Sequence, residues 1–228
     1  MPPRQQVYPI SLLLEDRACL VVGGGEVALS KITGLLEAGA RVSVIAPEVL
    51  SEITALPVRV LPRPYQEGDC DGFMLVVAAT GDRALEAAIY AECHGVTTLV
   101  NAADNPAACT FYLPALFRAG DLSVAISTAG ASPAIASWVR DRVGALLGEH
   151  FSDVVDIVAA TREQIRATSR TSEGLPWSDL IDQLTSALAE GTQLATASLL
   201  ASNWAASVIS ATDENRAANS ETNVEATS

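Results

Sequence analysis

The stretch ACLVVGGGEVA, residues 18–28, decides the fold. It begins as an apolar run that ends in glycines, which is typical of a strand buried on both faces of a sheet. Gly23-Gly24-Gly25-Glu26-Val27-Ala28 then fits the pattern G-x-G-x-x-G/A between a strand and a helix. In that pattern the glycines allow a tight turn and a close backbone approach to a pyrophosphate, and the last small residue lets the helix pack on the strand. The stretch therefore predicts a dinucleotide-binding turn.

The residues that follow alternate between helical and extended patterns. A helix is predicted over 26–38, with Gly39 as its C-cap, because apolar residues recur at helical spacing. The remaining elements expected in this half are strands at 41–47, 57–61, 73–79 and 97–101, and a helix at 82–94. Such alternation predicts an α/β fold with a Rossmann-like, doubly wound parallel sheet. We assign residues 1–112 to this dinucleotide-binding domain.

The second half is predicted to be mostly helical. One more strand is expected at 122–128, and Ser132-Pro133 then opens a helix with a serine N-cap and a proline in the first turn. That helix is expected over 133–150. It is followed by helices over 151–168 and 177–190 and by a loosely specified helix over 192–209. We therefore predict a small helical domain over 151–209. Residues 210–228 carry charges and no aromatic residue, which predicts a disordered acidic tail.

Composition excludes several classes of function. The formal net charge of −13 argues against nucleic acid and anionic membranes as partners. Neither a run of 18 apolar residues nor a signal peptide is seen, so we expect a cytoplasmic protein without a membrane partner. The chain has 4 cysteines without a CxxC pair and 2 histidines, so we expect neither a disulfide framework nor a resident metal.

An acidic residue at the expected distance supports a nicotinamide dinucleotide. Glu48 follows the second predicted strand, where an acid about 20 residues beyond the glycine motif binds a ribose hydroxyl. Residues 46–50 contain no arginine for a 2′-phosphate, which favours NAD over NADP. Lys31, the single lysine beside thirteen arginines, is interpreted either as a charge near the phosphates or an anionic substrate, or as an exposed helix lysine.

Two further loops carry candidate site residues. Asp104 follows the strand at 97–101, at the sheet edge where ligands bind in open α/β sheets, and is either a general base or a turn former. The small-residue loop 127–133 either binds an anion through its N–H groups and hydroxyls or simply joins a strand to a capped helix. Arginines near these segments either hold substrate carboxylates bidentately or are solvated; they are Arg118, Arg140 and Arg142.

Three stretches together resemble the precorrin-2 dehydrogenase / sirohydrochlorin ferrochelatase family, the module also found at the front of siroheme synthases. They are YPISLLLEDRACLVVGGGEVALSKITGLLEAGARVSVIAPE, LVVAATGD and VNAADNPAACTFYLPALFRAGDLSVAISTAGASPAIASWVRD. They cover most of residues 8–142. The resemblance implies NAD-dependent oxidation of precorrin-2 to sirohydrochlorin, a homodimer with residues 113–150 as its dimerisation segment, and in many members Fe²⁺ insertion to give siroheme.

The resemblance also implies roles for individual residues. The family's catalytic aspartate falls on Asp104, and its dinucleotide contacts fall on Glu26-Val27 and Pro47-Glu48. A serine implicated near the tetrapyrrole falls on Thr128, which keeps the hydroxyl and adds a methyl group. The substrate-binding set that we expect is Thr128, Ser132, Arg118, Arg140 and Lys31.

Alternatives remain open at this stage. The chain is a bifunctional dehydrogenase and chelatase, a dehydrogenase without chelatase activity, or a non-catalytic dinucleotide-dependent sensor. The metal inserted, as a substrate, is Fe²⁺ or Co²⁺.

Overall fold

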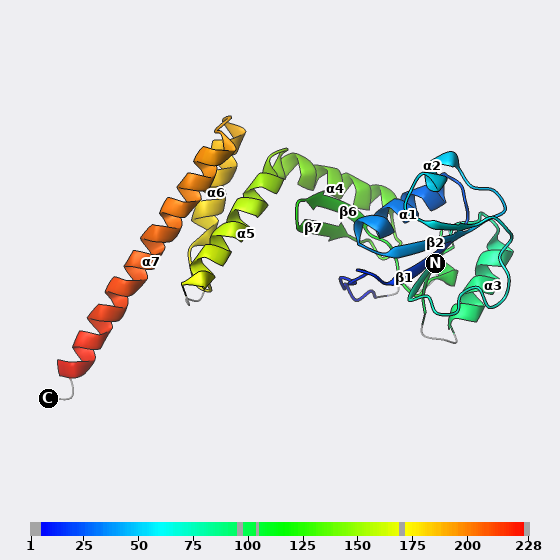
Figure 1. Ribbon diagram of the computed structural model, residues 1–228, viewed down its shortest axis with the longest axis horizontal. Coiled ribbons are helices and arrows are strands. Elements are labelled where there is room, and N and C mark those ends of the chain that lie inside the picture. The colour runs from blue at the N-terminus through cyan, green and yellow to red at the C-terminus, as the bar shows by residue number, and fades with distance from the viewer. Residues whose placement is uncertain (1–5, 95–97, 104, 169–171, 226–228) are drawn as a thin grey trace. The chain divides into compact units, whose positions relative to one another are not determined.

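The computed structural model describes residues 6–94, 98–103, 105–168 and 172–225, and the chain divides into two compact units. The first unit comprises Met1–Pro114 together with Ser127–Ser132. The second comprises Ala115–Ile126 and Pro133–Ser228. Figure 1 shows the sheet of the first unit and the hairpin and helices of the second.

A five-stranded parallel sheet forms the centre of the first unit. Its strand order is β3-β2-β1-β4-β5, so β1 lies between β2 and β4 and the chain reverses its direction of winding there. The strands are β1 (Ala18–Val22), β2 (Arg41–Ile45), β3 (Arg59–Leu61), β4 (Leu75–Ala78) and β5 (Leu99–Ala102). This order confirms the predicted Rossmann-like sheet, and it places the ligand edge beyond the carboxyl ends of β1, β4 and β5.

Each face of the sheet is covered by its own core. Cys19 and Val21 of β1 pack with Ile32 of α1 (Glu26–Glu37), whereas Leu20 and Val22 lie in the cluster that contains α3 (Arg83–His94). The alternation follows from the period of two in a strand and explains why β1 is apolar throughout. Short helices α2 (Ser51–Thr54) and η1 (Pro106–Ala108) follow β2 and β5.

Helix α1 begins at Glu26 as the sequence predicts and ends at Glu37, one residue earlier than predicted, with Ala38 rather than Gly39 as its C-cap. Ala28, Ile32 and Leu35 are buried at helical spacing. Gly39 follows the C-cap with a φ of +76°, and its N–H donates to the carbonyl of Leu36 at 2.9 Å. This left-handed position ends the helix, as expected for a glycine there.

The second unit combines a β-hairpin with helices. Strands β6 (Ala115–Ala119) and β7 (Leu122–Ile126) pair antiparallel, and α4 (Pro133–Leu147) packs on them. The helices α5 (Phe151–Ala167), α6 (Trp177–Ala189) and α7 (Leu194–Glu225) share one apolar core. The rings of Trp177 and Trp204 lie with their centroids 5.0 Å apart in that core.

Two expectations for this half need correction. The strand β6 was not predicted, although the turn Gly120-Asp121 between two apolar runs is a hairpin signal, and Gly120 has a φ of +55°. The tail predicted to be disordered from residue 210 is instead part of α7, which continues to Glu225. The sequence has no glycine or proline after Gly191 and is rich in alanine, so nothing local stops the helix.

One stretch of α7 bears on the expectation of no membrane partner. Leu194–Ala211 has a mean hydropathy of 1.3 and is long enough to cross a membrane, by length and composition only, with 17% of it buried inside the protein. Polar residues such as Thr196, Ser202 and Asn203 interrupt its apolar positions. The absence of a membrane partner therefore stays a prediction.

Candidate active site

The glycine turn packs closely against two backbone segments, one at Ala79 and one at Glu48. Gly23 has a φ of +130°, its N–H donates to the carbonyl of Ile45 at 2.9 Å, and a Cβ atom on it would overlap the carbonyl of Ala79. A Cβ atom on Gly24 would overlap the carbonyl oxygen of Glu48. Glycine is therefore required at both positions. At Gly23 both the positive φ and the lack of space for a Cβ atom require it, and at Gly24 the lack of space alone does.

Gly25 differs from its two neighbours. It is the N-cap of α1, and a Cβ atom on it would meet nothing within 4 Å. No side chain caps this helix, so the N–H groups of its first turn, at Glu26 and Val27, have no side-chain acceptor at the cap. Exposed N–H groups at the positive end of a helix dipole, with open space before them, fit a dinucleotide pyrophosphate.

A pocket of about 160 Å³ lies at the carboxyl edge of the sheet. Its walls come from the start of α1, the ends of β4 and β5, and the start of α3; the residues are Val27, Ala79, Gly81, Arg83, Glu86 and Ala103. Two ladder hydrogen bonds fix its floor, from Ala79 N–H to Val22 O and from Ala103 N–H to Ala78 O, both 2.8 Å. The pocket therefore occupies the predicted ligand position beside the glycine turn.

The loop after β4 supplies polar groups that sequence reasoning did not assign. Asp82 caps α3, because its Oδ1 accepts the N–H groups of Ala84 at 2.9 Å and Leu85 at 3.2 Å. The Thr80 hydroxyl donates to Glu86 Oε1 at 3.4 Å, and the Glu86 side chain is only 2% exposed. A buried carboxylate thus lies at the wall of the pocket. The available signal was the Thr-Gly-Asp turn followed by a glutamate on the first turn of a helix.

Asp104 lies outside the described residues, but the structure describes the loop on both sides of it. Cys109 Sγ accepts the N–H of Ala102 at 3.3 Å and lies 3.4 Å from the carbonyl oxygens of Ala102 and Asn105. Burial is the main cause that raises the pKa of this thiol, so it stays protonated and donates to one of those carbonyls. The thiol therefore contacts Ala102 and Asn105, which lie before and after Asp104 in the chain.

The residues that follow this loop, Thr110 and Phe111, are hydrogen-bonded to β5. The Thr110 N–H donates to the carbonyl of Val100 at 2.8 Å, and Asn101 Nδ2 donates to the carbonyl of Phe111 at 3.0 Å. Asn101 on β5 is 7% exposed, and its side-chain amide holds the backbone of this segment.

Glu48 lies where the sequence predicts, beside the glycine turn. Pro47 and Glu48 are exposed, and the Leu50 N–H donates to the carbonyl of Gly24 at 2.9 Å. The acid and the turn are therefore joined through the backbone, and a contact from Glu48 to a ribose stays a prediction. Lys31 is half-buried on α1.

The predicted substrate-binding residues are divided between the two units. Thr128 and Ser132 belong to the first unit, and the Thr128 hydroxyl accepts the Ser132 N–H at 3.0 Å and donates to its carbonyl at 3.1 Å. Arg118 on β6 and Arg140 on α4 belong to the second unit, where Arg140 pairs with Asp141 at 2.7 Å. The Thr128 hydroxyl therefore closes its own loop, and roles toward a substrate stay predictions for all of these residues.

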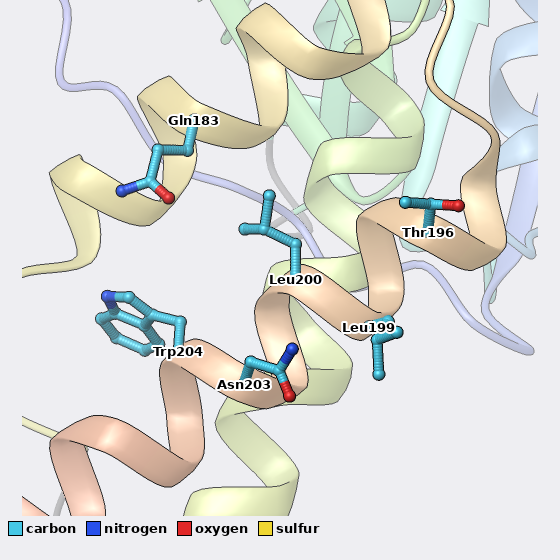
Figure 2. A pocket seen from close by; sticks show the side chains of 6 residues that line it. All are labelled: Gln183, Thr196, Leu199, Leu200, Asn203 and Trp204. Carbon is cyan, nitrogen blue, oxygen red and sulfur yellow. The ribbon is translucent and has the colours of Figure 1, made fainter.

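A second hollow lies within the second unit, between α6 and α7 (Figure 2). Its lining residues are Gln183, Thr196, Leu199, Leu200, Asn203 and Trp204. None of these side chains titrates near neutral pH, so this open groove offers no acid–base chemistry. Among the described residues, no three potential ligands gather to hold a metal ion.

Comparisons with known families agree with this geometry. A family of NAD(P)-binding domains matches residues 10–115, and a family described as the central part of sirohaem biosynthesis proteins matches residues 119–146. The first match covers the glycine turn and the pocket, and together with the structural neighbour described next it supports NAD as the cofactor.

Individual relatives point the same way. The chain is 40% identical over 164 residues to a siroheme synthase of Methylococcus capsulatus and 37% identical over 164 residues to one of Thioalkalivibrio sulfidiphilus. These matches cover 69% and 70% of this chain, but it spans only about a third of those proteins, 34% in each case. A solved structure of SirC, precorrin-2 dehydrogenase, matches 88% of this chain and 100% of its own, with a TM-score of 0.67 and 26% identity.

Proposed function

Because the chain belongs to the family of precorrin-2 dehydrogenases and siroheme synthase amino-terminal modules, we propose that it oxidises precorrin-2 to sirohydrochlorin with NAD⁺. The observation that carries the proposal is the position of the pocket. It lies between the uncapped start of α1 at Val27 and the end of β5 at Ala103, the residue directly before Asp104. The residues at the first wall would hold the dinucleotide, and the second wall leads in the sequence directly to Asp104.

The chain's own residues would hold NAD in two places. The open position at Gly25 and the N–H groups of Glu26 and Val27 would bind the pyrophosphate. The Glu48 carboxylate would accept hydrogen bonds from the adenosine ribose, since its backbone is fixed against Gly24. When bound, NAD⁺ supplies the hydride acceptor for the reaction.

Asp104 would accept the proton that precorrin-2 loses on oxidation. Oxidation of precorrin-2 removes a hydride and a proton, and a carboxylate within hydrogen-bond reach of the departing proton can accept it. The thiol of Cys109 and the hydrogen bonds of Asn101 and Thr110 hold the described residues that precede and follow Asp104 in the chain. Thr128, Ser132, Lys31, Arg118 and Arg140 are proposed to bind the carboxylates of the tetrapyrrole.

We also propose that the chain inserts a metal ion into sirohydrochlorin, with Fe²⁺ or Co²⁺ as a substrate. This step needs pyrrole protons to leave and a transient carboxylate contact, which Asp104 would provide. The step as proposed uses no resident metal.

A homodimer in the cytoplasm is the proposed form of the protein. Large apolar side chains are exposed on the hairpin and on α4 of the second unit, Trp138 at 63% and Leu146 at 82%. Leu116 and Ile135 are exposed there as well. Exposed apolar patches of this kind mark interaction surfaces, and burial between two copies would remove them from water. Sedimentation of the chain and of Trp138→Glu tests this, with a dimer expected for the first and a monomer for the second.

An anaerobic assay tests the activity. Purified chain, precorrin-2 and NAD⁺ should give sirohydrochlorin and NADH, followed by absorbance, and added Fe²⁺ or Co²⁺ should give a further spectral change. Asp104→Ala should abolish chelation and weaken or abolish oxidation, whereas Asp71→Asn in an exposed turn should leave both rates unchanged. Oxidation without the metal-dependent change would leave a dehydrogenase alone. Bound NAD without any oxidation would favour a dinucleotide-dependent sensor and overturn the proposal.

A further inference from the structure

A buried pair of thiols lies in the first unit, away from the glycine turn. Cys70 is in the turn between β3 and β4, and Cys93 is in the last turn of α3. Both are 0% exposed, and their sulfur atoms lie 2.7 Å apart. A disulfide bond is about 2.05 Å long, so the two sulfurs need to approach by less than about 1 Å to bond.

A tyrosine and a carboxylate lie beside the pair. The Tyr65 hydroxyl donates to Glu92 Oε2 at 2.6 Å and lies 3.0 Å from Cys70 Sγ, a contact in which either atom can be the donor. The Cys93 thiol in turn donates to Cys70 Sγ. The Glu92 carboxylate also accepts the N–H of Gly68 at 3.0 Å, so the pair is linked through Tyr65 and Glu92 to the backbone of the turn.

This arrangement makes the two thiols unequal. The hydrogen bond from Cys93 is the main cause that lowers the pKa of Cys70, and the same bond is the main cause that raises the pKa of Cys93. Cys70 is therefore the first of the pair to become a thiolate, and the thiolate is the nucleophile in disulfide exchange.

The other two cysteines are not arranged in this way. Cys19 is inside β1, where burial raises its pKa to about 11. The contacts of Cys109 are to Asn101 and to backbone atoms of its own loop. Among the described residues, Cys70 and Cys93 form the one pair of thiols in contact.

We propose that Cys70 and Cys93 are a modification site, at which exchange with a small-molecule disulfide forms a reversible disulfide bond that ties the turn over residues 66–73 to the end of α3. Several residues of this turn are exposed, including Gly68 and Gly72 with φ of +93° and +80°. Because both thiols are buried, the exchange requires this turn to open before a small reagent can reach Cys70.

The reaction balances as two successive exchanges. The Cys70 thiolate attacks one sulfur of the reagent, the reagent's S–S bond breaks, and one thiolate leaves and takes up a proton. Cys93 then loses its proton and attacks the Cys70 sulfur of the mixed disulfide, which releases the second thiol. Two electrons and two protons pass from the protein to the reagent.

Glutathione disulfide is the probe for the experiment. After incubation, acid quenching and denaturation, we expect the number of titratable thiols to fall from four to two and the intact mass to lose two hydrogens. Peptide mapping should locate a bond between Cys70 and Cys93, dithiothreitol should restore four thiols, and the oxidised protein should melt at a higher temperature because the bond restrains the unfolded chain.

Variants give the controls. The double variant Cys19→Ser, Cys109→Ser should still lose two thiols, and Cys93→Ser should form no internal disulfide. Retention of four thiols in the wild-type protein, under conditions that oxidise a reference dithiol, would overturn the proposal. A bond that maps to any other cysteine would overturn it too, and both results are read on the wild-type chain even if a variant does not fold.

Discussion

The backbone of Glu48 lies directly against Gly24, in the place that a Cβ atom on Gly24 would occupy. The hydrogen bond from Leu50 N–H to Gly24 O, at 2.9 Å, holds the two segments in that contact. Glu48, which is expected to bind a ribose, and the glycine turn, which is expected to bind a pyrophosphate, are thus held together through their backbones. Two neighbouring glycines can therefore be tested for different requirements.

Gly24→Ala should lower the free energy of unfolding by about 1–3 kcal/mol, because the new methyl group must displace the backbone of Glu48. Gly25→Ala should fold nearly as well, since a Cβ atom there meets nothing within 4 Å. It should nevertheless weaken NADH binding by about tenfold, about 1.4 kcal/mol, by filling space meant for phosphate. Urea unfolding and NADH fluorescence titration measure the two effects. Equal NADH affinity for wild type and Gly25→Ala would remove the phosphate site from this position.

Glu48→Arg should reverse the preference between the two nicotinamide dinucleotides. Loss of the carboxylate removes the acceptor for the ribose hydroxyls, and the guanidinium offers donors to a 2′-phosphate. We expect weaker NADH binding and stronger NADPH binding, with Glu48→Gln as the control that removes only the charge. If titration gives the same ratio of the two dissociation constants for all three proteins, Glu48 does not contact the ribose.

Asp82→Ala should destabilise the first unit by about 1 kcal/mol, because it leaves the N–H groups of Ala84 and Leu85 without their acceptor. Asp82→Asn should recover most of this loss, since its amide oxygen still caps the helix. Glu67→Ala, in an exposed turn, should change stability by less than about 0.5 kcal/mol. Chemical denaturation of the wild type and the three variants measures their free energies of unfolding. An unchanged value for Asp82→Ala would mean that the stability of α3 does not depend on its cap.

Acid should weaken the turn that carries Cys70. The Arg63 guanidinium, 2.6 Å from Asp69, donates hydrogen bonds that hold the pKa of that carboxyl below its usual range. A lowered pKa in the folded state gives stability that is full above the unfolded value, and it is lost as the pH falls through the folded value. The wild-type melting temperature should therefore fall below about pH 4 with a steeper slope than that of Asp69→Asn. Parallel slopes across this range would exclude the ion pair as the cause.

The sequence predicts the first unit well because its signals are local. Gly23, Ala28 and Gly39 each report a backbone requirement within a few residues, so β1, α1 and their connection are found with small errors at the ends. Glu86 was missed because its burial depends on the packing of α3 against the sheet. The contact between Cys70 and Cys93 joins residues 23 positions apart and cannot be read from either neighbourhood.

The second half is harder to predict for a related reason. The helix α7 contains no strong start or stop signal in its alanine-rich and serine-rich sequence, so polar composition suggested a tail where the helix continues. The hairpin had a local signal at Gly120-Asp121, but its strands are short and half-exposed, which weakens their alternation.

The order in which the chain visits its two units limits how the protein can be divided. The chain leaves the first unit after Pro114, returns to it for Ser127–Ser132, and leaves again at Pro133. A single cut at any of these points deprives one unit of part of its own backbone: a fragment that stops at Pro114 lacks the loop with Thr128 and Ser132. The two units therefore cannot be exchanged by a single crossover. A chimera that takes its helices from a relative must keep Ser127–Ser132 from the same protein as the first unit.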